Sequence, residues 1–228
     1  MLRLLTLIFL GWMPLQLLAQ DGTAQLQQLM AKWNLVKDYT VQVNIRSEIP
    51  LIKSFPVKAT LYFKQKDQFR MVSKGIAILP KQNFNELPKF LQQKDRYTAL
   101  ITGSELIQNQ KTTIITVLPS DDSGDLVLLK VWIDSKTDLL LKSQTTTRSN
   151  GTISALYEYG SQRAVGLPDK MIFTVEVKKF KIPKGLATDI NRSSSPDAAK
   201  PTPKNGKITI SFADYQINKG IKDEIFRK

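Results

Sequence analysis

Residues 39–49, Tyr-Thr-Val-Gln-Val-Asn-Ile-Arg-Ser-Glu-Ile, carry the pattern that decides the fold. Apolar and polar side chains alternate along most of this stretch. Successive side chains of a strand point to opposite faces, so the alternation predicts a long strand with one buried face. Residues 56–73 repeat the alternation on both sides of a polar turn at residues 65–67, which predicts a hairpin.

The alternation continues downstream, interrupted by turn-type sequences. Further predicted strands cover residues 98–102, 105–108, 112–118, 126–134, 139–148, 152–159, 170–180 and 206–216. Asn150-Gly151, between two β-rich runs, is a strong hairpin signal. Because strands do not alternate with helices, the sequence predicts an antiparallel, meander-like sheet rather than a parallel one.

Two segments have helical periodicity instead. In residues 23–34, apolar side chains recur on one face from Leu26 to Trp33, which predicts a helix with Thr23 as its N-cap. Residues 80–95 break the strand pattern and predict a loop followed by a short helix from about Pro88 to Gln93. The fold class is therefore mainly β (α+β), with few and short helices.

So few helices leave much of the sheet to be buried in another way. A single antiparallel sheet can leave one face in water but must bury the other. The sheet must therefore curl on itself or enclose an apolar concavity, and such a concavity would accommodate a lipid tail. The alternative is a closed barrel or sandwich with a filled core, and periodicity alone does not separate the two.

Residues 1–20 have the pattern of a cleaved signal peptide. Arg3 is the only charge, residues 4–10 form a short apolar run, and the exit after Ala19 is small and polar. A membrane-spanning helix needs about 20 predominantly apolar residues, and this run is shorter. We therefore expect export to the periplasm and a single domain over residues 21–228.

The chain contains no cysteine and no histidine, which excludes several kinds of chemistry. Ser-His-Asp and Cys-His catalysis, zinc sites built on these ligands, disulfides and lipid attachment at a cysteine are all ruled out. A hydrolase using Asp134 and Glu158 is the remaining enzymatic hypothesis, but their spacing forms no catalytic pair. We therefore predict a soluble protein that is not an enzyme, with no catalytic residue, no metal site and no cofactor.

The chain is strongly basic, with 33 lysines and arginines against 20 aspartates and glutamates and a net charge of +13. Part of this charge lies in residues 183–205, a Pro/Ser/Lys-rich stretch that we interpret as a flexible basic insertion. Export argues against nucleic-acid binding. Attraction to an anionic membrane, at about 1 kcal/mol per basic residue, is one reading of the charge, and a solvated loop is the other.

Several stretches, taken in order, resemble the LolA-like superfamily of periplasmic, outer-membrane lipoprotein carriers. They are the helix leading into residues 39–49, the hairpin 59–71, the run 129–134 with the strands 139–147 and 151–159, the turn 167–171, and the closing strand 210–218. The resemblance implies a strongly curved half-barrel of about eleven strands, with short helices covering its concave face and an acyl-chain cavity inside. Residues 75–84 depart from the usual pattern, so the chain is identified as a divergent member.

The candidate site residues follow from the strand phases and the predicted helix. Cavity candidates are Val41, Val43, Ile45, Leu61, Phe63, Phe69, Met71, Trp132, Val175 and Val177. Lid candidates are Phe84, Leu87, Phe90 and Leu91. Arg46 and Arg70, on the polar phase of their strands, are candidates to contact a lipid headgroup or tether the lid. Each apolar residue is also a candidate for ordinary core, and each arginine for a solvated strand face.

These observations predict a monomeric carrier that binds lipid or lipoprotein acyl chains and transfers them between membranes, as in outer-membrane lipoprotein sorting. Its other contacts would be transient, with a membrane surface or membrane-bound proteins. Two alternatives remain. One is a module that senses a lipid or lipoprotein and regulates a protein partner, and the other is a filled β-barrel with a structural role.

Overall fold

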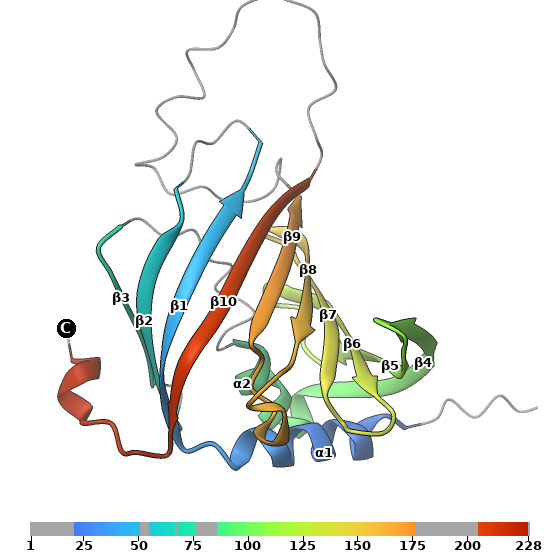
Figure 1. Cartoon of the computed structure of the whole chain (residues 1–228). Helices are drawn as coiled ribbons and strands as arrows, with labels where there is room; N and C mark the ends of the chain where they lie inside the picture. Colours follow the sequence, from blue (N-terminus) through green and yellow to red (C-terminus); the bar gives the residue numbers. More distant parts are fainter. Residues whose placement is uncertain (1–20, 51–54, 67, 76–85, 177–204, 228) are drawn as a thin grey trace, which may run out of the picture.

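The computed structural model describes residues 21–50, 55–66, 68–75, 86–176 and 205–227 of the chain (Figure 1). The predicted signal peptide, Phe84, Val177 and all but the last residue of the predicted insertion lie outside these residues. The exception is Asn205, which is the first residue of a strand.

The described residues form ten strands, two α-helices and three short 3-10 turns. The strands are β1 (Asp38–Glu48), β2 (Val57–Lys64), β3 (Gln68–Ser73), β4 (Tyr97–Ile107), β5 (Gln110–Pro119), β6 (Leu126–Asp134), β7 (Leu140–Thr147), β8 (Gly151–Glu158), β9 (Lys170–Glu176) and β10 (Asn205–Ile217). The helices are α1 (Thr23–Asn34) and α2 (Glu86–Gln92), and the turns are η2 (Lys94–Arg96), η3 (Arg163–Val165) and η5 (Asp223–Phe226).

All ten strands belong to one antiparallel sheet, in the order β3-β2-β1-β10-β9-β8-β7-β6-β5-β4. The last strand, β10, lies between β1 and β9, so the end of the chain joins the first hairpin to the later meander. The sheet is strongly curved, with α1 across one end of it (Figure 1). β3 and β4 are its two outer strands, so the described strands form an open half-barrel rather than a closed barrel.

One strand of the structure was predicted as two separate strands. The predicted strands 98–102 and 105–108 form the single strand β4, which stays paired with β5 across an irregularity between Ile101 and Gly103. Gly103 has φ of 155°, a conformation that residues with a side chain rarely adopt. The interruption in the sequence pattern is therefore a bulge inside one strand, and the described residues give the sheet ten strands where about eleven were expected.

Helix α1 covers the residues predicted for it, but its first turn is satisfied differently. Gly22, not Thr23, is at the N-cap position, and glycine has no side chain that could accept a helix N–H. Instead, the Asp21 carboxylate accepts hydrogen bonds from the Thr23 backbone N–H at 2.9 Å and from the Thr23 hydroxyl at 2.6 Å. A carboxylate beside the positive end of a helix is also favourable electrostatically.

The main core lies on the inner face of the sheet, beneath the two helices. Leu26 and Leu29 of α1 and Leu87 and Leu91 of α2 are all buried in it against the strands. Burying each such side chain contributes about 1.5–3 kcal/mol. Among the described residues, no helix is long and apolar enough to cross a membrane.

Candidate functional site

A cavity of about 470 Å³ lies at the end of the sheet closed by α1. The side chains and loops around it come from α1, α2, the β2–β3 turn, the loop after η3 and the nearby ends of five strands. Its lining residues are Met30, Trp33, Asn34, Val36, Tyr39, Phe63, Gln65, Lys66, Pro88, Gln92, Tyr157, Tyr159, Gly166, Leu167, Pro168, Met171, Phe212 and Tyr215. The volume lies within the range of about 300–1,000 Å³ that is usual for small-molecule sites.

Aromatic rings form one wall of the cavity. Tyr39 of β1 stacks on Phe63 of β2 with ring centroids 5.1 Å apart, and it meets Tyr215 of β10 edge-on at 5.7 Å. Tyr215 in turn stacks on Phe212 at 6.0 Å. Such pairs are each worth about 0.5–1.5 kcal/mol beyond the area they bury. The rings therefore hold one another in place around the space.

Three of the four tyrosine hydroxyls in the lining are hydrogen-bonded. The Tyr159 hydroxyl donates to the Leu140 carbonyl and the Tyr215 hydroxyl to the Pro168 carbonyl, both at 2.8 Å. The Tyr157 hydroxyl is 3.0 Å from that of Ser143. Burial raises the pKa of Tyr157 to about 12 and also raises the pKa values of the other two tyrosines. These hydroxyls stay neutral and complete the wall without introducing charge.

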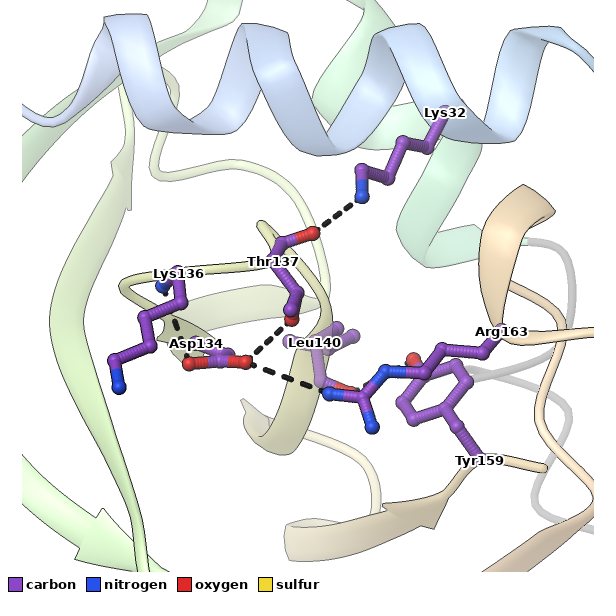
Figure 2. A network of polar contacts seen from close by, with 7 residues as sticks. All are labelled: Lys32, Asp134, Lys136, Thr137, Leu140, Tyr159 and Arg163. Atoms are coloured by element: carbon purple, nitrogen blue, oxygen red, sulfur yellow. Dashed lines mark hydrogen bonds and ion pairs between the residues drawn. The ribbon is translucent and has the colours of Figure 1, made fainter.

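A network of polar contacts joins α1, the β6–β7 turn and η3 next to the cavity (Figure 2). The buried Asp134, at the end of β6, accepts hydrogen bonds from the Thr137 hydroxyl and the Lys136 N–H and lies 3.8 Å from the Arg163 guanidinium of η3. Lys32 of α1 donates to the Thr137 carbonyl in the same turn. The β6–β7 turn therefore links α1, which borders the cavity, to η3, which the lining residues 166–168 follow directly.

Most predicted cavity residues lie in filled core rather than on the cavity. Val41, Val43, Ile45, Leu61 and Val175 are at most 3% exposed and belong to the main cluster. Phe69 and Met71 are partly buried and pack against that cluster. Of the predicted set, Phe63 alone among the described residues lines the cavity.

The structure separates Trp132 from the other candidates. It belongs to a second buried cluster with Ile107, Leu139 and Leu141. Its indole N–H donates to the Glu105 carboxylate at 2.5 Å, and the Lys142 ammonium lies 4.2 Å from its ring centroid. Trp132 therefore packs under a polar cover away from the cavity.

The lid candidates lie on α2, which does border the cavity, though through other residues. Leu87 and Leu91 are buried in the core, and Phe90 packs on Tyr97 with centroids 5.4 Å apart. The α2 residues that line the cavity are Pro88 and Gln92. α2 thus covers the inner face, while its predicted leucines anchor it.

The two candidate arginines have different surroundings. Arg46 is exposed on β1. Arg70 donates to the carbonyls of Ile225 and Arg227, at 2.6 and 2.7 Å, and so fixes the C-terminal turn η5 against β3. Within the described residues Arg70 is therefore a tether for the end of the chain and not for α2.

The described residues contain no cluster of three or more acidic side chains that could hold a metal ion. Asp134 is engaged in the network of Figure 2, and Glu158 pairs with Lys170 at 2.6 Å. Both carboxylates of the hydrolase hypothesis therefore have structural partners.

Most of the lining residues were not among the candidates predicted from the sequence. Trp33, Tyr157, Tyr159, Phe212 and Tyr215 line the cavity, and none was among the candidates. A signal for them was present, because β1, β2, β8 and β10 each carry an aromatic residue near one end. Neighbouring antiparallel strands place such ends together, but the sheet order is needed to see which ends meet.

Comparisons with known proteins agree with this architecture. A family model, the MucB/RseB N-terminal domain, matches residues 57–157. No curated protein matches the chain. A domain named for outer membrane lipoprotein sorting from Vibrio parahaemolyticus superposes with a TM-score of 0.60 at 10% identity, covering 90% of this chain and 95% of that one.

Two further solved structures are similar over nearly their whole length. The LolA superfamily protein NE2245 from Nitrosomonas europaea has a TM-score of 0.57 at 12% identity, covering 89% of this chain and 97% of that one. A DUF1329 family protein from Desulfovibrio piger has the same score and identity, with coverages of 91% and 98%. The fold predicted from the resemblance is thereby confirmed: the chain has a LolA-like fold, at 10–12% identity to these structures.

Proposed function

We propose that this chain is an exported, non-enzymatic carrier that binds the acyl chain of a lipid or lipoprotein in the cavity beneath α1 and transfers it between membranes. The observation that carries the proposal is the cavity itself, a space of about 470 Å³ walled mainly by aromatic and aliphatic side chains and bordered by two helices. Each methylene that leaves water for such a site contributes about 0.8 kcal/mol. The periplasm is the compartment in which such a carrier is needed, because acyl chains cross water poorly without a cover.

Lipid analysis tests the proposal directly. Protein purified from a periplasmic fraction is extracted with organic solvent, and the extract is examined by mass spectrometry. We expect co-purified lipid or lipopeptide, and we expect the emptied protein to bind a fluorescent fatty acid. Protein that is consistently empty and binds no such probe would overturn the carrier function.

A variant that fills the cavity shows where the ligand sits. Leu167→Trp places a larger side chain in the lining and is expected to abolish probe binding. Leu118→Trp makes the same change on the 42% exposed Leu118, which does not line the cavity, and should leave binding unchanged. Equal binding by both variants would place the ligand elsewhere.

A second candidate function uses the same cavity to sense a lipid or lipoprotein and regulate a protein partner. It rests on the same cavity, and the match of residues 57–157 to the MucB/RseB N-terminal domain makes the chain similar to a family that is not named for lipoprotein sorting. The carrier releases its lipid to a membrane, whereas the sensor forms a stable complex with a protein partner. A stable protein partner recovered in pull-down, with no transfer of lipid between vesicles, would replace the carrier by the sensor.

A further inference from the structure

The size and charge of the cavity narrow the class of ligand, on the basis of the proposed function. A water molecule occupies about 30 Å³ in the liquid, and a methylene group is of similar size. A cavity of about 470 Å³ then has room for about 16 such groups. This is the volume of one long acyl chain. A diacyl lipid or a triacylated lipoprotein with chains of this length would need about two or three times this volume.

Among the described residues, the lining carries charge of one sign only. Lys66 is the one charged residue among the described lining residues, and no carboxylate is among them. Lys66 is exposed and lies in the β2–β3 turn. A polar group at the mouth of an apolar cavity selects the headgroup, and an ammonium selects an anion.

The turn that carries Lys66 is held firmly at the end of α1. The Gln65 backbone N–H donates to the Lys37 carbonyl at 2.7 Å, and its side-chain amide donates to the carbonyls of Asn34 and Val36, both at 3.1 Å. The Asn218 side chain donates to the Leu35 carbonyl at 3.0 Å. The carbonyls that would repel an anion at this helix end are therefore already hydrogen-bonded.

We propose that the cavity takes a single acyl chain of up to about 16 carbon atoms that carries an anionic headgroup, with Lys66 contacting the headgroup at the mouth. A free fatty acid and an anionic lysophospholipid share this chemistry. The first presents a carboxylate and the second a phosphodiester.

Competition against a bound dansyl fatty acid tests both parts of the proposal, with native mass spectrometry giving the stoichiometry. The competitors are myristic acid, myristoyl lysophosphatidylglycerol, the neutral monomyristoylglycerol, dimyristoyl phosphatidylglycerol and a triacylated lipopeptide. We expect one-to-one complexes with the single-chain ligands. The two anionic ones should bind about two- to five-fold more tightly than the neutral one, the range expected of a partly exposed ion pair. Comparing them identifies the preferred headgroup.

Lys66→Met removes the charge and keeps the length of the side chain. It should erase the preference for anionic ligands, so that the two anionic single-chain ligands and monomyristoylglycerol compete equally well. Lys58→Met is the matched control, because Lys58 is an exposed lysine of β2 that does not line the cavity. If Lys66→Met and Lys58→Met behave alike, Lys66 is not the headgroup contact.

The outcomes separate this inference from the proposed function. If the two-chain lipid or the lipopeptide binds most tightly, the carrier function stands and the single-chain inference is overturned. If the neutral ligand competes as well as the anionic ones, the headgroup part is overturned. If no amphiphile displaces the probe or forms a complex, both the inference and the carrier function fail.

Discussion

The inner face of the sheet has two ends with different packing, although the same strands build both. At the aliphatic end, Val41 and Ile45 of β1 and Ile208 and Ile210 of β10 are at most 2% exposed and fill the core. At the aromatic end, close to α1, Tyr39, Phe63, Phe212 and Tyr215 surround the cavity. Branched aliphatic side chains interdigitate to near crystalline density. Rings fixed by stacking and by hydroxyl hydrogen bonds hold their positions, so space remains between them.

Two neighbouring positions on the same face of β2 test this difference in packing most directly. Leu61 is 1% exposed at the aliphatic end, and Phe63 lines the cavity at the aromatic end. Leu61→Ala should lower the free energy of unfolding by about 2–5 kcal/mol, because it opens a void in packed core. Phe63→Ala removes a larger side chain and yet should cost less than about 2 kcal/mol, mainly through its stack on Tyr39.

Urea denaturation measures both values, and the fluorescent fatty acid measures the complementary loss. Phe63→Ala should weaken probe binding, whereas Leu61→Ala should leave it nearly unchanged in the folded fraction. Equal costs in stability would mean that the two ends are packed alike.

Alkaline pH tests the same difference in packing, because the most deeply buried tyrosines lie at the aromatic end. Burial raises the pKa of Tyr157 from 10.0 to about 12. As pH rises, the unfolded chain releases this proton first. The contribution of Tyr157 to the free energy of unfolding is therefore complete below pH 10 and is lost between pH 10 and about 12. The loss is about 3 kcal/mol for Tyr157.

We therefore expect urea midpoints to fall above pH 10 and tyrosinate absorbance to rise together with unfolding. Tyr157→Phe has no hydroxyl to titrate and should show a smaller fall, from a lower starting stability, because Ser143 loses its partner. Tyrosinate absorbance that rises fully while the protein remains folded would contradict the buried aromatic end.

The sequence predicted the architecture well because strand and helix periodicities are local. The helix at residues 23–34 has the bounds expected for it, and every predicted strand lies within or overlaps a strand of the sheet. The error at β4 is also local, because a bulge interrupts alternation without ending the strand. The half-barrel itself came from the resemblance rather than from periodicity.

The site was harder to predict, because alternation shows which residues face inward but not whether the space beyond them is filled. Val41 and Tyr39 have the same phase on β1, yet one lies in filled core and the other lines the cavity. The difference depends on α1 and η3, whose positions are set by long-range contacts. Arg70 illustrates the same point, since its partners are about 155 residues away in the sequence.

The smallest expected effect concerns the polar network that fastens the aromatic end from outside. Asp134→Asn keeps the shape of the side chain but removes the charge that faces Arg163. It also replaces one accepting oxygen with a donor, which then faces either the Thr137 hydroxyl or the Lys136 N–H. Hydrogen bonds to charged groups are worth about 1.5–3 kcal/mol, and the asparagine retains part of the network, so a loss of about 1–2 kcal/mol is expected.

Asp138→Asn is the matched control in the same turn. Asp138 has a positive φ of 52°, a conformation that asparagine tolerates, so this variant should be close to neutral. Because the network joins α1 and η3, Asp134→Asn should also speed amide hydrogen exchange at the C-terminal end of α1. Exchange should stay slow in those parts of β9 and β10 that lie at the aliphatic end. Uniformly faster exchange throughout the sheet would mean that Asp134 supports the whole fold, and the aromatic end would then have no separate fastening.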